Sequence, residues 1–349
     1  TILAVRPKGS YTAVQRVENL INFLRIEGKH EPLVIPAEID KPGLGLSEEH
    51  RRILRDVPEV LHCAADTSFA ERKKEQVETT NLQGLQNVFD AVPNCERFFH
   101  MSSVYSAGRQ EGLIMEEMQY PSNFHNPYEQ SKNEAENLIT ELCREKRTDL
   151  TVFRPSITYG DASNGESLRF NALYFPVRTL LFFRDSLKKD ILERSGKRAK
   201  NLGVSMDKNG VINLPLTFPG NGRLNLVPIN FLVKAITSIM ASGEIGIFHV
   251  VNPISNDVEQ IIEYIGRHYS ISGLEVADDV VQGGPLQTLI NSYMDLYYPY
   301  FCDKKIFSDY RTREILKPLG IECPELTSEV FKRCMDFGIE AGWGSKIKV

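Results

Sequence analysis

The chain alternates short apolar runs with amphipathic helical segments from its first residue, and this alternation limits the possible folds more than any other feature. Strands are expected at residues 1–5, 33–35, 60–63, 97–101, 150–153, 224–227 and 247–251. Helices are expected at residues 12–26, 47–55, 76–91 and 230–240, and another begins at Asn126. Such alternation is typical of a parallel sheet covered by helices on both faces. The sequence therefore predicts an α/β fold built on a doubly wound parallel sheet.

The length of 349 residues suits one large domain and one smaller one. Residues 167–216 break the alternation with an aromatic, apolar segment followed by a basic one, and the chain is mostly helical in pattern from residue 256 onward. An insertion of this kind is typical of a separate lobe or a mobile lid. We expect a sheet domain of residues 1–166 and 211–255, and a smaller, mostly helical substrate lobe of residues 167–210 and 256–349.

A tyrosine and a lysine stand four residues apart at the start of the helix that begins at Asn126. Asn126 is a suitable N-cap and Pro127 a suitable first helical residue. Tyr128 and Lys132 share one face of this helix, and the face continues through Ala135, Leu138, Ile139 and Leu142. A lysine on an apolar face needs a polar partner. Judged on spacing alone, an ordinary snorkelling lysine is the better explanation, because Tyr-x-x-x-Lys is common by chance.

Polar residues follow three of the expected strands, at the edge where ligands meet an open parallel sheet. They are His62 to Ala65, Ser102 to Tyr105, and Arg154 to Ile157. Each of these segments alone is more often a structural turn. Together with the pair of Tyr128 and Lys132, these segments match the order of motifs found in one enzyme superfamily.

The arrangement resembles the extended short-chain dehydrogenase/reductases. Within them it is most similar to the branch of the fatty acyl-CoA reductases of the male sterility type and the thioester reductase domains. The likeness spans residues 1 to about 253. It is carried by His62-x-Ala64-Ala65, Asn81-x-x-Gly84, Phe99-His100-Met101-Ser102-Ser103-Val104-Tyr105, Asn126-Pro127-Tyr128-x-x-Ser131-Lys132, Arg154-Pro155-Ser156-Ile157 and Leu224-Asn225-Leu226-Val227-Pro228.

The resemblance implies a Rossmann-like fold and a role for each matching residue. Tyr128 would be the proton donor to a carbonyl oxygen, and Ser103 would hydrogen-bond the same oxygen. Lys132 would bind the nicotinamide ribose and, as a cation, lower the pKa of the tyrosine. The implied cofactor-binding residues are Arg6, Arg16, Asp40, His62, Ala64, Ala65, Asn81, Tyr128, Lys132, Pro155, Ser156 and Ile157.

The sequence departs from the family pattern at the pyrophosphate site. A Gly-rich turn after the first strand is expected there, and residues 1–5 align instead with the second strand of the family. We therefore expect the natural protein to have a preceding strand and turn. Arg6, at the end of this strand, stands where an acidic residue would hold the ribose of NAD, and a basic residue suits the 2'-phosphate of NADP. The expected cofactor is NADPH.

The expected reaction is the NADPH-dependent reduction of an acyl thioester to an aldehyde, and possibly on to an alcohol, with a coenzyme A or carrier-protein substrate. The apolar residues 170–183 and 293–301 would line a lipophilic channel or belong to the core. The basic residues 188–200 would meet the phosphates of the thioester arm or form a solvated loop. The alternatives are a nucleotide-sugar epimerase or dehydratase of the same superfamily, and a cofactor-binding regulatory protein without turnover.

Composition narrows the partners and the location. The formal net charge of −5 gives no electrostatic reason to expect a nucleic-acid partner. The six cysteines are scattered without metal-ligand spacing, which predicts reduced thiols and no metal site. No run approaches the roughly 18 apolar residues of a membrane span, and no signal peptide is recognisable. We expect a cytoplasmic protein, and the oligomeric state is left open.

Overall fold

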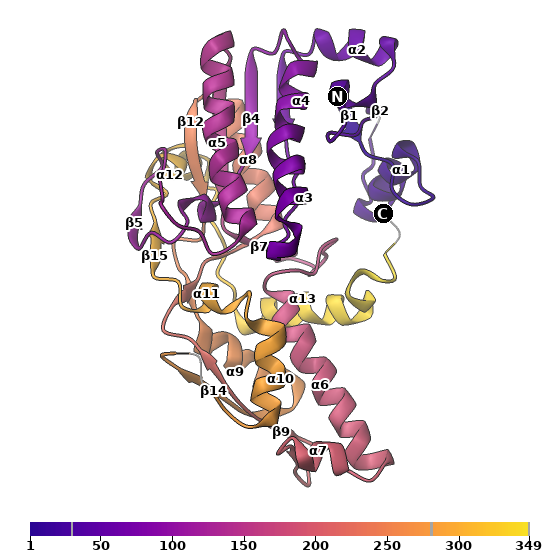
Figure 1. Ribbon diagram of the computed structural model, residues 1–349, viewed down its shortest axis with the longest axis vertical. Helices are drawn as coiled ribbons and strands as arrows, with labels where there is room; N and C mark the ends of the chain where they lie inside the picture. Colours follow the sequence, from indigo (N-terminus) through magenta and orange to yellow (C-terminus); the bar gives the residue numbers. More distant parts are fainter. Residues whose placement is uncertain (29–30, 280–281, 348–349) are drawn as a thin grey trace.

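A computed structural model describes residues 1–28, 31–279 and 282–347 of the chain. Its centre is a four-stranded parallel sheet of order β12-β6-β4-β3 (Figure 1). The strands are β3 (Glu59–His62), β4 (Arg97–Met101), β6 (Asp149–Pro155) and β12 (Gly246–Val250). Successive side chains of a strand point to opposite faces, so Phe98 and Phe99 of β4 enter two different cores.

Helices cover both faces of this sheet, as the alternation predicts. On one face, α5 (Pro127–Lys146), α4 (Gly84–Ala91) and α2 (Glu48–Arg55) pack around Phe98. On the other face, α8 (Ile229–Ser242) and α12 (Tyr310–Leu316) pack around Phe99. The expected doubly wound α/β architecture is confirmed.

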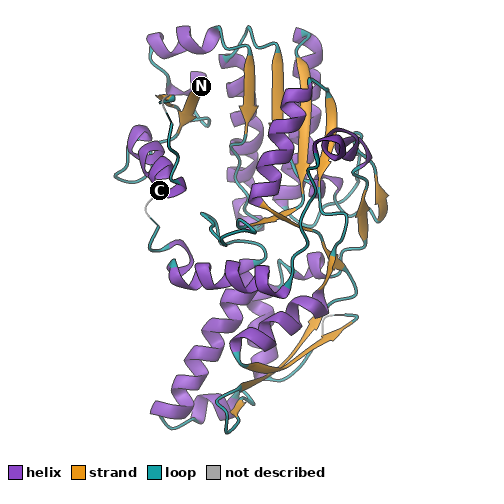
Figure 2. Cartoon of the chain, turned by 180° about the vertical axis from the view of Figure 1, so that it is seen from behind, coloured by secondary structure: helices purple, strands orange, loops and turns teal. Residues whose placement is uncertain are grey.

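The parallel sheet is divided between its second and third strands in chain order. β1 (Ile2–Val5) pairs with β2 (Leu33–Pro36), and α1 (Ala13–Leu24) connects them. In the parts of the chain that the structure describes, β1 pairs with β2 alone and β3 pairs with β4 alone. Figure 2 shows the two groups of strands standing apart. Each group therefore has an edge with unpaired backbone groups facing the other.

Two stretches deviate from the expected elements near the site. The helix expected at residues 76–91 is α3 (Lys74–Glu78), a π-turn at Thr79–Gln83 and then α4. The strand expected at residues 224–227 is β10 (Arg223–Leu224), paired with β13 (Asn256–Asp257), and β11 (Leu226–Pro228), paired with β7 (Ile157–Tyr159). The expectation that it joins the main sheet is therefore wrong. β11 pairs beyond Ser156, where the chain has already left the end of β6.

The lobe contains a sheet that was not predicted from the sequence. β9 (Ile212–Pro219) lies between β14 (Ile271–Ala277) and the short β8 (Ser205–Met206). β9 falls in the segment 211–255 that was expected in the sheet domain, and its pairing joins it to the lobe instead. This sheet packs with the helices around one large apolar core. The helices are α6 (Tyr174–Glu193), α7 (Lys197–Asn201), α9 (Val258–Tyr269), α10 (Pro285–Met294), α11 (Tyr298–Phe301) and α13 (Ser328–Glu340). A small parallel pair, β5 (Gly112–Ile114) and β15 (Lys305–Phe307), connects the lobe to the sheet domain.

The length and the apolar character of a helix decide whether it can cross a membrane. Within the described ranges, no helix combines the length and the apolar character that a transmembrane span requires.

Candidate active site

The tyrosine and the lysine lie at the start of α5, which begins as its first residues predict. The side chain of Asn126 accepts a hydrogen bond from the backbone N–H of Glu129 at 3.1 Å, and Pro127 is the first helical residue. Lys132 is only 4% exposed, and its Nζ donates to the backbone carbonyl of Met101 at 2.7 Å. The buried lysine therefore has the polar partner that its burial requires.

Ser103 reaches this pair from the end of β4. Its buried hydroxyl accepts a hydrogen bond from the backbone N–H of Tyr105 at 3.2 Å and forms another with Tyr128. The neighbouring Ser102 instead donates to the carboxylate of Glu136. The structure thus places Ser103, and not Ser102, against the tyrosine.

The pKa of Tyr128 moves opposite to the expected direction. Burial raises this pKa to about 12, the hydrogen bond with Ser103 lowers it in part, and the charge of Glu129 raises it. The ammonium of Lys132 lies 6.0 Å from the centre of the Tyr128 ring. At that distance it does not reverse the effect of burial, so the expectation of a lowered tyrosine pKa is wrong. Tyr128 is a protonated phenol at neutral pH.

Burial changes the pKa of Lys132 as well. It lowers this pKa to about 8, although Glu136 and Cys63 raise it in part. A lysine keeps its proton below its pKa and loses it above. Lys132 is therefore mostly a cation at neutral pH and becomes neutral as the pH rises through about 8.

Two buried histidines lie beside Lys132. The ring of His62, at the end of β3, stacks on that of His100 in β4, with 5.8 Å between the ring centres. Burial and the charge of Lys132 lower the pKa of His62 to about 3 and the pKa of His100 well below its usual value. Among the described residues, neither ring nitrogen of His100 has a hydrogen-bond partner. Both rings are therefore neutral at physiological pH.

Asn81 holds the loop after β3 against α5. Its side chain accepts from the backbone N–H of Asp66 at 2.7 Å, and donates to the Asp66 carbonyl at 3.0 Å and to Ser131 Oγ at 2.8 Å. Asn81 lies in the π-turn, a feature frequent at functional sites. Ala64 and Ala65 stand in the loop that these hydrogen bonds fasten.

The segment after β6 contributes a buried hydroxyl without a partner. Pro155 ends β6, Ile157 begins β7, and Ser156 between them is 6% exposed. Within the described part of the chain, no group hydrogen-bonds the Oγ of Ser156. An unsatisfied buried hydroxyl is costly, and a bound polar group would satisfy it. The residues at this edge of the sheet therefore fit a polar cofactor.

The remaining predicted cofactor residues belong to the β1–α1–β2 part. Arg6 is exposed after β1, and Nη1 of Arg16 in α1 donates to the Arg6 backbone carbonyl at 2.6 Å. Asp40 is exposed after β2. The structure brings Arg6 and Arg16 together at the end of β1.

A buried ion pair, which was not predicted as part of the site, links the elements that carry the site residues. Arg154 of β6 and Glu136 of α5 have side chains that are 1% and 0% exposed, and Nε of Arg154 donates to Glu136 Oε1 at 2.9 Å. Nη1 of Arg154 donates to the backbone carbonyl of Glu117 at 2.9 Å. With the hydroxyl of Ser102, the pair joins β4, α5 and β6 next to Ser103.

Three partly buried aromatic residues lie near Tyr128, and we call them the aromatic strip. Phe175 and Tyr297 belong to the segments expected to line a channel or to form core, whereas Phe69 was not predicted. The ring centre of Phe69 lies 5.9 Å from that of Tyr128 and 5.9 Å from that of Tyr297. Phe175, near the start of α6, stacks on Tyr297 at 4.9 Å. In the sequence, Tyr297 and Phe175 appear only within aromatic runs, and no spacing indicates that they meet.

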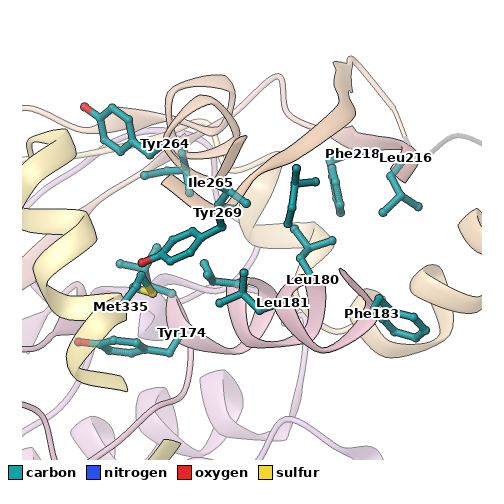
Figure 3. Close-up of a cluster of buried hydrophobic side chains, with 14 of the residues drawn as sticks. Tyr174, Leu180, Leu181, Phe183, Leu216, Phe218, Tyr264, Ile265, Tyr269 and Met335 are labelled. Atoms are coloured by element: carbon teal, nitrogen blue, oxygen red, sulfur yellow. The ribbon is translucent and has the colours of Figure 1, made fainter. Parts of the chain in front are cut away.

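Most of residues 170–183 form core rather than a channel. Phe170, Leu173, Tyr174, Val177, Leu180, Leu181 and Phe183 are buried among residues of α9, α13 and β9. Figure 3 shows several of them facing Tyr269, Ile265 and Met335. The lipophilic-channel interpretation is therefore wrong for these residues, because the opposing sheet and helices already cover them. Phe175 is the member that reaches the aromatic strip.

The basic residues 188–200 lie away from Tyr128. They occupy the end of α6 and α7, and Figure 1 places α7 at the opposite end of the molecule from α5. At 1.5 Å per residue along α6, the first of them, Lys188, lies roughly 20 Å from Phe175. The interpretation that they line the mouth of the site is therefore wrong.

Comparison with known proteins gives a family and several relatives that match this chain in part or nearly throughout. The family described as "Male sterility protein" matches residues 1–236. A linear gramicidin synthase of Brevibacillus parabrevis is 20% identical over 97% of this chain and 6% of its own length. Fatty acyl-CoA reductase 1 of Mus musculus is 30% identical over 34% of this chain and 24% of its own length. The chain thus spans a small part of these curated relatives.

Solved structures with the same fold include several reductase domains. The terminal R domain from the myxalamid PKS-NRPS pathway has a TM-score of 0.71 at 17% identity, covering 99% of this chain and 85% of that chain. A thiolation-reductase di-domain from an archaeal non-ribosomal peptide synthetase has a TM-score of 0.65 at 15% identity, covering 99% and 84%. UDP-glucuronic acid 4-epimerase from Bacillus cereus, in complex with NAD, has a TM-score of 0.61 at 12% identity, covering 99% and 89%. At these identities, the likeness shows the fold.

Proposed function

Because the chain belongs to the male sterility protein family of the extended short-chain dehydrogenase/reductases, we propose that it is an NADPH-dependent reductase that converts an acyl thioester to an aldehyde. The expected superfamily and the expected class of NAD(P)-dependent oxidoreductase are confirmed by this match. The observation that carries the proposal is the meeting of Ser103, Tyr128 and Lys132 at one edge of the sheet. These three side chains suit the reduction of a carbonyl group.

The side chains have separate tasks in this reaction. NADPH, when bound, supplies the hydride that the carbonyl carbon accepts. Tyr128, protonated because burial raises its pKa, donates its proton to the carbonyl oxygen. The hydroxyl of Ser103 donates a hydrogen bond to the same oxygen as negative charge develops on it. The resulting hemithioacetal then loses its thiol, which breaks the C–S bond and leaves an aldehyde.

The cofactor residues proposed are those at the sheet edge and those of the β1–α1–β2 part. Lys132 and Ser156 offer a buried ammonium and an unsatisfied buried hydroxyl. His62 ends β3 beside Lys132, Ala64 and Ala65 follow in the next loop, and Asn81 in the π-turn fastens this loop to α5. Pro155 and Ile157 flank Ser156, and Arg6, Arg16 and Asp40 lie beyond the division of the sheet.

A strand with a Gly-rich turn would complete the pyrophosphate site. The edges of β1 and β3 both lack a partner among the described residues, and Leu61 of β3 is 42% exposed. We propose that a further parallel strand pairs with both edges and brings the turn that holds the pyrophosphate. The sequence of the encoding gene upstream of Thr1 tests this. Without such a strand in the gene, we would favour the regulatory alternative.

Arg6 is expected to determine the preference for NADPH over NADH. Replacing it with aspartate should shift the ratio of kcat/KM values toward NADH by one to two powers of ten, about 1.4 to 3 kcal/mol, because a charge-assisted contact with the 2'-phosphate is lost. Steady-state kinetics with both cofactors measures this ratio. Arg194→Asp, at the distant end of α6, is the control and should leave it unchanged. An unchanged ratio in Arg6→Asp would show that Arg6 faces solvent.

An apolar acyl group suits the aromatic strip better than a sugar nucleotide does. Rings in contact with Tyr128 offer apolar surface, and burying an acyl chain yields about 0.8 kcal/mol per CH₂. We expect kcat/KM to rise severalfold per two carbons along a series of acyl thioesters. Phe175→Ala should flatten this rise, whereas Phe182→Ala, on the same helix but 63% exposed, should not. If kcat/KM of the wild-type protein does not change with acyl length, the aromatic strip does not bind the acyl chain.

NADPH oxidation with a panel of substrates tests the function directly. The panel contains a long-chain acyl-CoA, a short acyl thioester, an aldehyde and a UDP-sugar. Oxidation with a thioester, and aldehyde as product, is the expected result. Turnover of the UDP-sugar alone would favour the epimerase or dehydratase alternative. Binding of NADPH without any turnover would favour the regulatory one.

Delivery by a carrier protein and a cytoplasmic location complete the proposal. A reductase domain joined to a thiolation domain shares this fold, which suits a carrier-bound thioester as well as a coenzyme A ester. All six cysteines are free thiols, as a reducing compartment requires. Rates with the carrier-bound and the coenzyme A-bound form of one acyl group would show which form the protein prefers. Imaging of the tagged protein would show its cellular location.

A further inference from the structure

A ring of hydrogen bonds closes around the first turn of α5, and its last member comes from the lobe. Asn126 caps the turn through Oδ1, and its Nδ2 donates to the hydroxyl of Tyr300 at 2.7 Å. The hydroxyl of Tyr300 donates in turn to Oε1 of Glu129 at 2.7 Å. Oε2 of Glu129 accepts from the backbone N–H of His125 at 2.9 Å. The ring therefore encloses the backbone on both sides of Tyr128.

The ring of Tyr300 is fixed as firmly as its hydroxyl. Tyr300 belongs to α11 and is 6% exposed. It stacks on Phe69 with 5.4 Å between ring centres, and meets the edge of Tyr105 at 4.9 Å. Phe69 also packs on Tyr128. Tyr300 thus reaches the candidate proton donor by two routes, one through hydrogen bonds and one through aromatic packing.

Glu129 gives this contact an electrostatic consequence. Its side chain is fully buried, and burial raises its pKa, while the hydrogen bonds from His125 and Tyr300 and the charge of Lys305 lower it. The charge of Asp303 opposes them. Glu129 in turn raises the pKa of Tyr128. Removing the hydroxyl of Tyr300 would leave a buried carboxylate oxygen with one donor fewer, beside the proton donor.

We propose that Tyr300 is a positioning residue, through which the lobe holds the first turn of α5 so that the hydroxyl of Tyr128 meets the substrate carbonyl. This rests on the proposed function as far as Tyr128 is the proton donor, but it does not depend on the substrate being a thioester. Tyr300 touches neither substrate nor cofactor in this role. Its effect is therefore expected in kcat and only through Tyr128.

The test compares Tyr300→Phe with Tyr298→Phe. Both tyrosines belong to α11, both are 6% exposed, and the hydroxyl of Tyr298 donates to Asn291 of α10 at 2.7 Å instead of to α5. Each change removes one hydroxyl while the ring stays. Tyr300→Phe loses the hydrogen bonds with Glu129 and Asn126, and Tyr298→Phe loses the one with Asn291. We expect Tyr300→Phe to lower kcat five- to thirtyfold with KM values within twofold of wild type. Tyr298→Phe should keep at least half of the wild-type kcat, although it too removes a hydrogen bond within the folded protein.

A second arm separates positioning from general weakening of the fold. In a Tyr128→Phe background, Tyr300→Phe should cause no further fall in kcat, because residues that act through one group are not additive. A further fivefold fall there, or equal kcat in the two single variants, would overturn the proposal. The assay uses whichever carbonyl substrate of the panel the wild-type protein reduces. If the wild-type protein reduces the aldehyde but no thioester, the proposed function is contradicted, and Tyr300 is still tested with the aldehyde. If the wild-type protein reduces no substrate of the panel, both proposals are contradicted.

Discussion

Tyr128→Phe is expected to lower kcat by two to four powers of ten, the usual contribution of a general acid. The substitution removes one hydroxyl and keeps the ring that packs on Phe69. Ser103 then loses its hydrogen bond with Tyr128 but keeps the one from the backbone N–H of Tyr105, and the carbonyl oxygen receives no proton from Tyr128. The affinity for NADPH and the melting temperature should stay nearly unchanged, because Lys132 keeps its contact with Met101.

Steady-state kinetics, NADPH titration and thermal unfolding of the same preparation measure these quantities. Tyr310→Phe, with a side chain that is 61% exposed, is the control and should resemble the wild-type protein. A Tyr128→Phe variant with near-normal kcat would remove the tyrosine from the mechanism. The wild-type rate should also show no loss from ionisation of Tyr128 between pH 6 and 9, since its pKa of about 12 lies well above this range.

Arg154→Met is expected to give the largest loss of stability, about 3 to 5 kcal/mol in the free energy of unfolding, because it leaves a buried carboxylate without its partner. Glu136 is 0% exposed, and after this change it would keep the hydrogen bond from Ser102 and the electrostatic interaction with Lys132, but no ion-pair partner in direct contact. The loss should appear in urea unfolding as a lower midpoint with an unchanged slope. Loss of activity is expected as well, because Ser103 is the neighbour of Ser102.

Two comparison variants show whether the buried charge is the cause. Arg144→Ala breaks the exposed pair with Glu141 on the same helix and should cost less than about 1 kcal/mol. Adding Glu136→Met to Arg154→Met removes the unpaired charge and should recover at least half of the lost stability. A double variant that is no more stable than Arg154→Met would mean that packing, and not charge, dominates at this place.

The sequence predicted most of the sheet domain because its elements are determined by local patterns. β4 has the expected bounds, α5 begins at Pro127 behind the Asn126 cap, and Ser47 caps α2. Capping and period are properties of neighbouring residues, so they can be read along the chain. The elements of the lobe were predicted less well. Residues 212–218 of β9 do alternate between apolar residues and others, so this strand could have been recognised, but its pairing with β14 across about 60 residues is not indicated by any local pattern.

The proposed catalytic residues Ser103, Tyr128 and Lys132 were identified from the resemblance to a family. Their positions agree with it, since Tyr128 and Lys132 share a helix face and Ser103 follows a strand at the same edge of the sheet. The ion pair of Arg154 with Glu136, the aromatic strip and the contact of Tyr300 with α5 were decided by tertiary structure alone. Tyr300 lies 171 residues from Glu129, and the folding of the lobe onto the sheet brings them together. The pKa of Tyr128 likewise depends on how deeply the folded chain buries it. Burial sums over neighbours from the whole chain, and no local pattern records it.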